Sequence, residues 1–163
     1  YLITQAKDDP LRYIHDEIGY NFRITNIQAA LGVAQLEQLP GFLQRKKDIY
    51  QQYVEAVGKI EGLAMAGVPD YANNHHWMNV LQIDGATYGS DREGLMQRLE
   101  ENGIQTRPVW GLNHLQKPYQ DSQTYRIECA GKQVEMSLCI PSSTNLKNDC
   151  IENIIELIKK EKK

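Results

Sequence analysis

Residues 19–30 read GYNFRITNIQAA, and the chain is organised around this stretch because an extended segment turns into a helix within it. Thr25 followed by Gln28 fits a capping box, in which each side chain satisfies a backbone N–H at a helix start. Asn21 and Arg23 place an amide and a cation beside that helix start, whose positive potential suits an anion such as phosphate. These residues also fit a plainer interpretation, a well-capped and tightly packed helix preceded by a loop arginine.

A long helix is predicted from residue 25 onward. Apolar side chains recur at intervals of three and four residues between Ile24 and Ala34, which is one stripe of a helix. Pro40 cannot donate a hydrogen bond, so it should kink this helix or start a second one. The apolar spacing resumes after Pro40 and continues to Val57, where Gly58 supplies a plausible stop.

Three polar clusters are predicted to have no binding role. The run 15–17 (HDE) holds three metal-ligand types, but adjacent positions do not share a face, so a solvated loop is the better interpretation. The same argument makes His75 and His76 ordinary strand or edge residues and not a joint metal site. The basic run 45–47 (RKK) is expected to be a solvated helix face.

The rest of the chain predicts shorter elements in an α+β arrangement. A helix should begin at Ser90 or Asp91 and end at Asn102-Gly103, and the last helix should be capped by Asn145 or Asn148. Further elements are expected as strands over 63–65, 75–83, 104–106 and 136–140 and a short helix over 124–133. The predicted fold is a long kinked N-terminal helix, with further helices packed on one side of a small, mainly antiparallel sheet.

Composition excludes several classes of function. The chain has 163 residues, of which 41% are hydrophobic and 24% charged, enough for one domain with a real core. Its net charge of −3 gives no electrostatic footprint for nucleic acid, and no apolar run approaches the roughly 20 residues that span a bilayer. Cys129, Cys139 and Cys150 lack paired spacing, which is typical of reduced thiols in a cytoplasmic protein.

Residues 107–115 (RPVWGLNHL) break all periodicity and gather groups that suit recognition. Arg107 is a fork-shaped cation, Trp110 offers an indole ring and His114 an imidazole. In the alternative interpretation, Trp110 fills the core and Arg107 pairs with an acid. The residues alone leave both interpretations open.

The run 13–23 (YIHDEIGYNFR), followed by 28–32 (QAALG) and Gln35-Leu36, resembles the signature of the DegT/DnrJ/EryC1/StrS aminotransferases. These are pyridoxal-phosphate (PLP) enzymes that aminate keto sugars attached to nucleotides. The resemblance implies the small C-terminal domain of a fold-type I aminotransferase. Residues 1–24 would then connect from an N-terminal domain that this chain lacks, and residues 25–163 would form the C-terminal domain.

The resemblance also implies a role for particular residues. Asn21 falls where the family places an Asn that reaches the PLP phosphate of the neighbouring subunit, with Arg23 in the same region. Arg107 and Trp110 lie in a segment resembling the loop that approaches the nucleotide-linked sugar. The residues expected to contact that substrate are Tyr20, Arg107, Trp110 and His114.

No lysine in this chain occupies the family's Schiff-base motif, so we expect no catalytic residue in it and no PLP bound to it alone. The expected partners are its own missing N-terminal domain, a second copy in a homodimer, the nucleotide-linked sugar and an amino donor, glutamate. The product would be of the 4-amino-4,6-dideoxy sugar type. The alternative is a non-catalytic self-association or interaction module, indicated by the small residues Ala29, Ala30 and Ala34 on one helix face.

Overall fold

The computed structural model describes residues 23–160, and Tyr20, Asn21 and the run 15–17 predicted as a solvated loop therefore lie outside the described residues. The chain divides into two units, residues 1–40 and residues 41–163. The described part of the first unit is Arg23–Pro40, most of it helical. The second unit holds the rest of that helix and every strand of the described sheet.

The long helix α2 runs from Asn26 to Val57. The predicted capping box is confirmed: the N–H of Thr25 donates to Oε1 of Gln28 at 2.9 Å, and the N–H of Gln28 donates to Oγ1 of Thr25 at 3.3 Å. Pro40 lies inside α2, so of the two alternatives predicted for it, the start of a second helix is excluded. An interior proline removes one backbone hydrogen bond, and the remaining bonds of this 32-residue helix sustain it.

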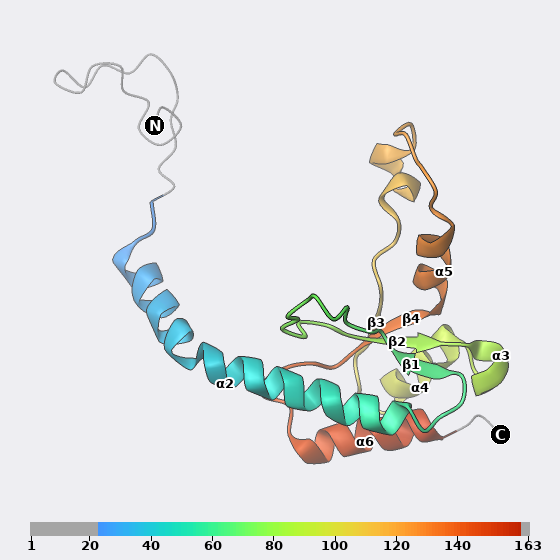
Figure 1. Cartoon of the computed structure of the whole chain (residues 1–163), viewed down its shortest axis with the longest axis horizontal. Helices are drawn as coiled ribbons and strands as arrows, with labels where there is room; N and C mark the ends of the chain where they lie inside the picture. Colours follow the sequence, from blue (N-terminus) through green and yellow to red (C-terminus); the bar gives the residue numbers. More distant parts are fainter. Residues whose placement is uncertain (1–22, 161–163) are drawn as a thin grey trace. The chain divides into compact units, whose positions relative to one another are not determined.

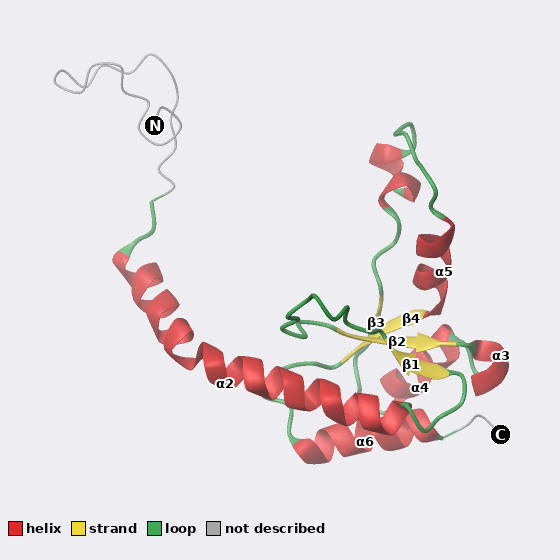
Figure 2. Cartoon of the chain, in the orientation of Figure 1, coloured by secondary structure: helices red, strands yellow, loops and turns green. Residues whose placement is uncertain are grey.

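Four short strands form one antiparallel sheet in the order β1-β2-β4-β3 (Figure 2). They are β1 Leu63–Met65, β2 Asn79–Ile83, β3 Arg107–Pro108 and β4 Ser137–Ile140. The register pairs Leu81 with Leu138 across β2 and β4. The pairing of β2 with β4 thus joins segments that are 55 to 61 residues apart in the sequence, and the short strand β3 lies at one edge of the sheet.

The hydrophobic core lies between the sheet and the helices on one of its faces. Figure 1 shows α4 (Arg92–Glu101) and α6 (Asn148–Lys159) on the same side of the sheet as the second part of α2. Ile49, Leu81 and Ile151 are completely buried there. Burial of one such side chain contributes roughly 1.5–3 kcal/mol. This packing explains why the second unit forms a stable support for a site.

Two helices depart from the predicted arrangement. The short helix α3 (Gly85–Tyr88), capped by Asp84, was not expected from the sequence. Helix α5 (Glu128–Met136) lies on the opposite side of the sheet from α6 (Figure 1), where Gln82 donates to Gln133 at 2.6 Å. The α+β class is confirmed, but the helices do not all cover one face.

Several predicted boundaries are corrected by the structure. The strand expected from residue 75 begins at Asn79, and the strand expected over 104–106 forms two residues of ladder at 107–108. The cap of α4 is Asp91, as predicted, whose carboxylate accepts the N–H of Gly94 at 2.8 Å. Neither predicted asparagine caps α6: its N-cap is Lys147, which makes no side-chain cap hydrogen bond.

The basic run on α2 is not a fully solvated face, contrary to the prediction. Arg45 and Lys46 are half-buried, and both donate to backbone carbonyls of the segment that follows β4. The sequence pattern did not reveal this because the acceptors lie about 100 residues away. Over residues 23–160, no helix combines the length and apolar character needed to cross a membrane.

Candidate functional site

A pocket with a cavity of about 290 Å³ forms where the loop before β2, the loop after β3 and the end of β4 meet. We call it the aromatic pocket. Its lining residues are Trp77, Met78, Arg107, Pro108, Trp110, Ile140 and Ser142. Sheet pairing places them together, because β2 and β3 are the two neighbours of β4.

Two indole rings make one wall of the aromatic pocket. The ring centroids of Trp77 and Trp110 are 6.1 Å apart with an interplanar angle of 27°. Both side chains are well exposed, at 63% and 69%. The alternative that Trp110 fills the core is therefore wrong. Exposed stacked rings offer apolar, flat surface to a planar or ring-shaped ligand.

Arg107 places a permanent positive charge at this pocket. It is exposed on β3, opposite Cys139 of β4. Among residues 23–160, no acidic side chain forms an ion pair with it, so the alternative of a structural ion pair finds no partner there. A guanidinium with free donors beside aromatic surface can bind phosphate in a bidentate manner.

The structure does not bring His114 into the same pocket. His114 lies in the short 3₁₀ turn η1 (Asn113–Leu115), which precedes a second turn, η2 (Lys117–Tyr119). It lines a separate hollow of about 460 Å³. The other lining residues of that hollow are Asn113, Tyr119, Ser122, Gln123, Thr124, Tyr125 and Ile127. Of the three predicted substrate contacts that the structure describes, it groups Arg107 with Trp110 and places His114 elsewhere.

Sequence reasoning missed Trp77 as a site residue. It appeared only as part of the strand expected over 75–83, but it lies in the loop that leads into β2. The preceding histidines have structural partners: the His75 ring accepts the N–H of Trp77 at 3.1 Å, and His76 stacks on Tyr50 with centroids 4.1 Å apart. Burial, followed by the charges of Lys47 and His75, lowers the pKa of His76. A recognisable signal was the Trp itself, an aromatic residue two positions before a strand.

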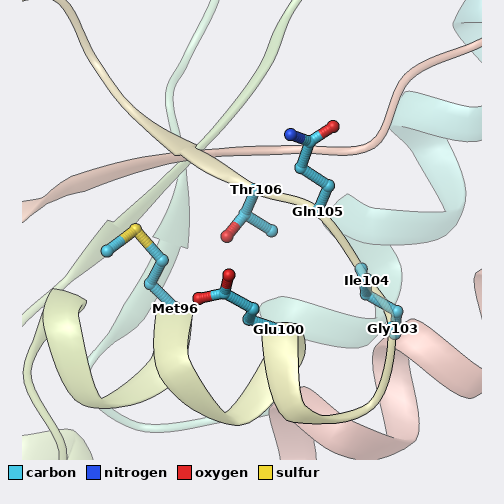
Figure 3. Close-up of a pocket in the computed structure, with 6 residues that line it drawn as sticks. All are labelled: Met96, Glu100, Gly103, Ile104, Gln105 and Thr106. Atoms are coloured by element: carbon cyan, nitrogen blue, oxygen red, sulfur yellow. The ribbon is translucent and has the colours of Figure 1, made fainter.

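A further hollow of about 370 Å³ lies between α4 and the segment that enters β3. Figure 3 shows the carboxylate of Glu100 and the hydroxyl of Thr106 pointing toward one another across it. The Thr106 hydroxyl is buried and has no hydrogen-bond partner within the described part of the chain. Residues 103–106 lead directly into Arg107, so this hollow and the aromatic pocket are joined by one backbone segment.

The helix start predicted to bind an anion is present. Arg23 is exposed three residues before α2 begins, and the capping box fixes the intervening backbone. Asn21 and Tyr20 lie outside the described residues, so their roles remain predictions. The positive end of a helix beside a guanidinium is a suitable environment for a phosphate group.

The described residues do not by themselves fit PLP. The cofactor needs a lysine beside an anion site, and no lysine lines the aromatic pocket. Lys46 is the half-buried lysine of the second unit, but oxygen atoms of Ser142 and Trp77 accept from its ammonium group. The other lysines between residues 23 and 160 are exposed. Within that range, no cluster of three or more metal-binding side chains is found either.

Comparison with known proteins gives consistent matches. The DegT/DnrJ/EryC1/StrS aminotransferase family matches residues 3–159. EpsN of Bacillus subtilis (strain 168), named as a candidate pyridoxal phosphate-dependent aminotransferase, is 32% identical over 164 residues, covering 97% of this chain and 41% of that protein. The GDP-perosamine synthase of Escherichia coli O157:H7 is 32% identical over 148 residues, with coverages of 90% and 39%.

Solved structures agree on the fold. The structure of DesI in the presence of its TDP-sugar product has a TM-score of 0.80 at 23% identity, covering 96% of this chain and 40% of that one. The fold, the family match and the sequence relatives together identify this chain as a portion of an aminotransferase. The chain belongs to the DegT/DnrJ/EryC1/StrS aminotransferase family, which confirms the resemblance seen in residues 13–36. It spans between 39% and 41% of the length of these relatives.

Proposed function

We propose that this chain is the C-terminal part of a PLP-dependent aminotransferase that transfers an amino group, from glutamate, to a keto sugar linked to a nucleotide. The product would be of the 4-amino-4,6-dideoxy type. The observation that carries the proposal is the similarity to GDP-perosamine synthases of Vibrio cholerae and Escherichia coli O157:H7, at 30% and 32% identity over at least 90% of the chain.

The aromatic pocket is assigned to the nucleotide-linked sugar. Arg107 would bind a phosphate of the diphosphate, since a guanidinium matches phosphate geometry. Trp77 and Trp110 would stack against a ring of the ligand. His114 and Tyr20 complete the proposed contacts, His114 from the neighbouring hollow. The exposure of Arg107 and Trp110 supports this assignment.

The cofactor contact is assigned to the segment before α2. Asn21 and Arg23 would bind the PLP phosphate of the neighbouring subunit, and the capped helix start beside Arg23 supports this. When bound, PLP supplies the electron sink for amine transfer. Because the described lysines do not fit that chemistry, the missing N-terminal domain would supply the reactive lysine. The isolated chain should then bind no PLP and be inactive.

The first part of α2 supports the proposed partners. Ile27, Leu31 and Leu36 are large apolar side chains that are all more than 60% exposed in this chain. Apolar surface of this kind favours an interface, which we assign to the missing N-terminal domain and to a second copy in a homodimer. The same exposed side chains support the alternative function, a non-catalytic self-association module. The free thiols of Cys129, Cys139 and Cys150 support a cytoplasmic enzyme.

The test uses the complete enzyme encoded by the gene that carries this chain. We expect amine transfer from glutamate to a GDP-linked keto sugar. Arg107→Gln should raise the KM for that sugar at least roughly tenfold, since a charged hydrogen bond contributes about 1.5–3 kcal/mol. Lys59→Gln removes an exposed charge from another surface and should leave KM unchanged. If the gene encodes no further aminotransferase domain, the alternative function is favoured instead.

A further inference from the structure

Lys46 of α2 contacts the backbone of two segments that line the aromatic pocket, the loop before β2 and the segment after β4. Its Nζ donates to the carbonyl oxygen of Ser142, to Oγ of Ser142 at 3.3 Å and to the carbonyl oxygen of Trp77 at 3.4 Å. An ammonium group has three donors and no acceptor, so three oxygen partners use its full capacity.

The two segments are also joined to each other. The hydroxyl of Ser142 donates to the same Trp77 carbonyl at 2.7 Å. Lys46, Ser142 and Trp77 therefore form a closed triangle of hydrogen bonds, which we call the lysine node. Both Trp77 and Ser142 line the aromatic pocket, whereas Lys46 does not.

We propose that Lys46 is a positioning residue that fixes Trp77 against Trp110 and so shapes the aromatic wall of the pocket. The inference deepens the proposed function and rests on it for the identity of the ligand. Because Trp77 lies in a loop outside the ladder of β2, strand pairing does not hold its backbone. The lysine node attaches that backbone to the second part of α2, which is packed in the core through Ile49 and Tyr53.

Other side chains of α2 contact the segment after β4, and Tyr50 stacks on His76, but Lys46 is the α2 side chain whose hydrogen bond within the described residues reaches Trp77 itself. Arg45 donates to the carbonyl of Leu146, and the hydroxyl of Tyr53 donates to the carbonyl of Pro141 at 3.1 Å. These contacts secure the segment after β4. Lys46 differs because its hydrogen bonds reach both walls of the pocket.

The environment of Lys46 agrees with this role. The side chain is half-buried, and burial lowers the pKa of its ammonium group from the ordinary value of 10.5. A hydrogen bond from a charged donor is roughly twice as strong as a neutral one. A neutral apolar substitute would therefore remove the charged hydrogen bonds to both carbonyls and leave the Trp77 carbonyl with the Ser142 hydroxyl as its donor.

The chain contains two tryptophans, and both are in the pocket, so tryptophan spectroscopy reports on it directly. Coupling between the two stacked indoles gives a pair of circular dichroism bands of opposite sign, a couplet. The variant Trp110→Phe has no indole pair and serves as the reference spectrum without the couplet. We expect Lys46→Met in the 163-residue chain to lose most of that couplet while thermal melting remains cooperative. Lys46→Arg should retain it, because a guanidinium can donate to the same carbonyls.

Two matched variants separate positioning from charge or general stability. Lys47→Met removes the same charge from an exposed neighbour, and Arg45→Met removes a hydrogen bond to the segment after β4 without touching Trp77. Both should keep the couplet. A folded Lys46→Met chain with an unchanged couplet would overturn the proposal, as would an equal loss in Arg45→Met.

A kinetic readout in the complete enzyme separates this proposal from the proposed function. There, Lys46→Met should raise the KM for the nucleotide-linked sugar roughly tenfold, as misplacement of a binding group does, with retained PLP. Lys46→Arg should restore KM. If the wild-type enzyme does not use such a sugar but Lys46→Met still loses the couplet, the proposed function fails and the positioning role stands. If KM and the couplet are both unchanged, the positioning role alone fails.

Discussion

Asn79 is a polar residue in the hydrophobic core, and it permits a sharp test of the packing. It is the first residue of β2, lies opposite Ile140 of β4 and is 1% exposed. Neither its amide nitrogen nor its amide oxygen has a hydrogen-bond partner among residues 23–160. The residue shares its sheet face with the buried Leu81. We predict that Asn79→Leu stabilises the chain.

The magnitude follows from the cost of the buried amide. A buried polar group without a partner costs about 1–3 kcal/mol, and leucine has the same branched side-chain skeleton without polar atoms, which removes that cost. Leucine is bulkier than asparagine, and accommodating the added volume costs at least about 1 kcal/mol. The expected net gain is therefore at most about 2 kcal/mol in the free energy of unfolding. For a chain of this length, that corresponds to a rise in Tm of at most roughly 8 °C.

Urea unfolding followed by far-UV circular dichroism measures the gain, with an unchanged m value as evidence of an unchanged fold. Asn145→Leu is the matched control: Asn145 is exposed, so the free energy should change by no more than about 0.5 kcal/mol. A loss of more than about 1 kcal/mol in Asn79→Leu would refute the reasoning, because it would mean that the amide forms hydrogen bonds in solution.

Asn79→Asp tests the same environment through pH. Burial would raise the pKa of the introduced carboxyl group above its unfolded value of about 3.9. The folded state would then hold the proton more tightly than the unfolded state does. The free energy of unfolding of this variant should therefore fall as pH rises above about 4, where the unfolded chain begins to ionise. At lower pH the protonated variant should approach the stability of the wild type. A flat pH profile relative to wild type would contradict apolar burial at this position.

Asn21→Ala in the complete enzyme should weaken PLP retention roughly 10- to 150-fold, for the loss of one charged hydrogen bond; unchanged retention in equilibrium dialysis contradicts its role. Gly62 has φ +79° and an added Cβ would meet the Tyr88 nitrogen, so Gly62→Ala should cost about 1–3 kcal/mol in urea unfolding. Gly89→Ala, at φ +82° but facing open space, should cost less. The Thr87 hydroxyl chiefly lowers the pKa of Asp84, so Asp84→Asn should weaken the loss of stability as pH falls below about 4; equal profiles would contradict this.

The elements that sequence predicted best are those specified by neighbouring residues. The capping box at Thr25 and the Asp91 cap act over three residues, so the residues that form each hydrogen bond stand together in the sequence. The predicted start of α6 was wrong although two asparagines nearby suit a cap. The helix begins after Lys147, which makes no side-chain cap hydrogen bond, and the buried apolar stripe of α6 stabilises the helix without one. Packing can override a local preference because each buried side chain contributes more than a cap.

The aromatic pocket shows why a site is harder to predict than the elements that carry it. Arg107 and Trp110 are close in sequence, so their type and spacing identified part of the pocket lining. Trp77 stacks on Trp110 only because β2 and β3 both pair with β4, a long-range register that no local pattern encodes. His114 illustrates the converse, since its closeness in sequence to Trp110 did not place it in the same pocket. Lys46 is the extreme case: on its helix it is one of three basic residues, and only the folded chain distinguishes it by placing carbonyls 31 and 96 residues away around its ammonium group.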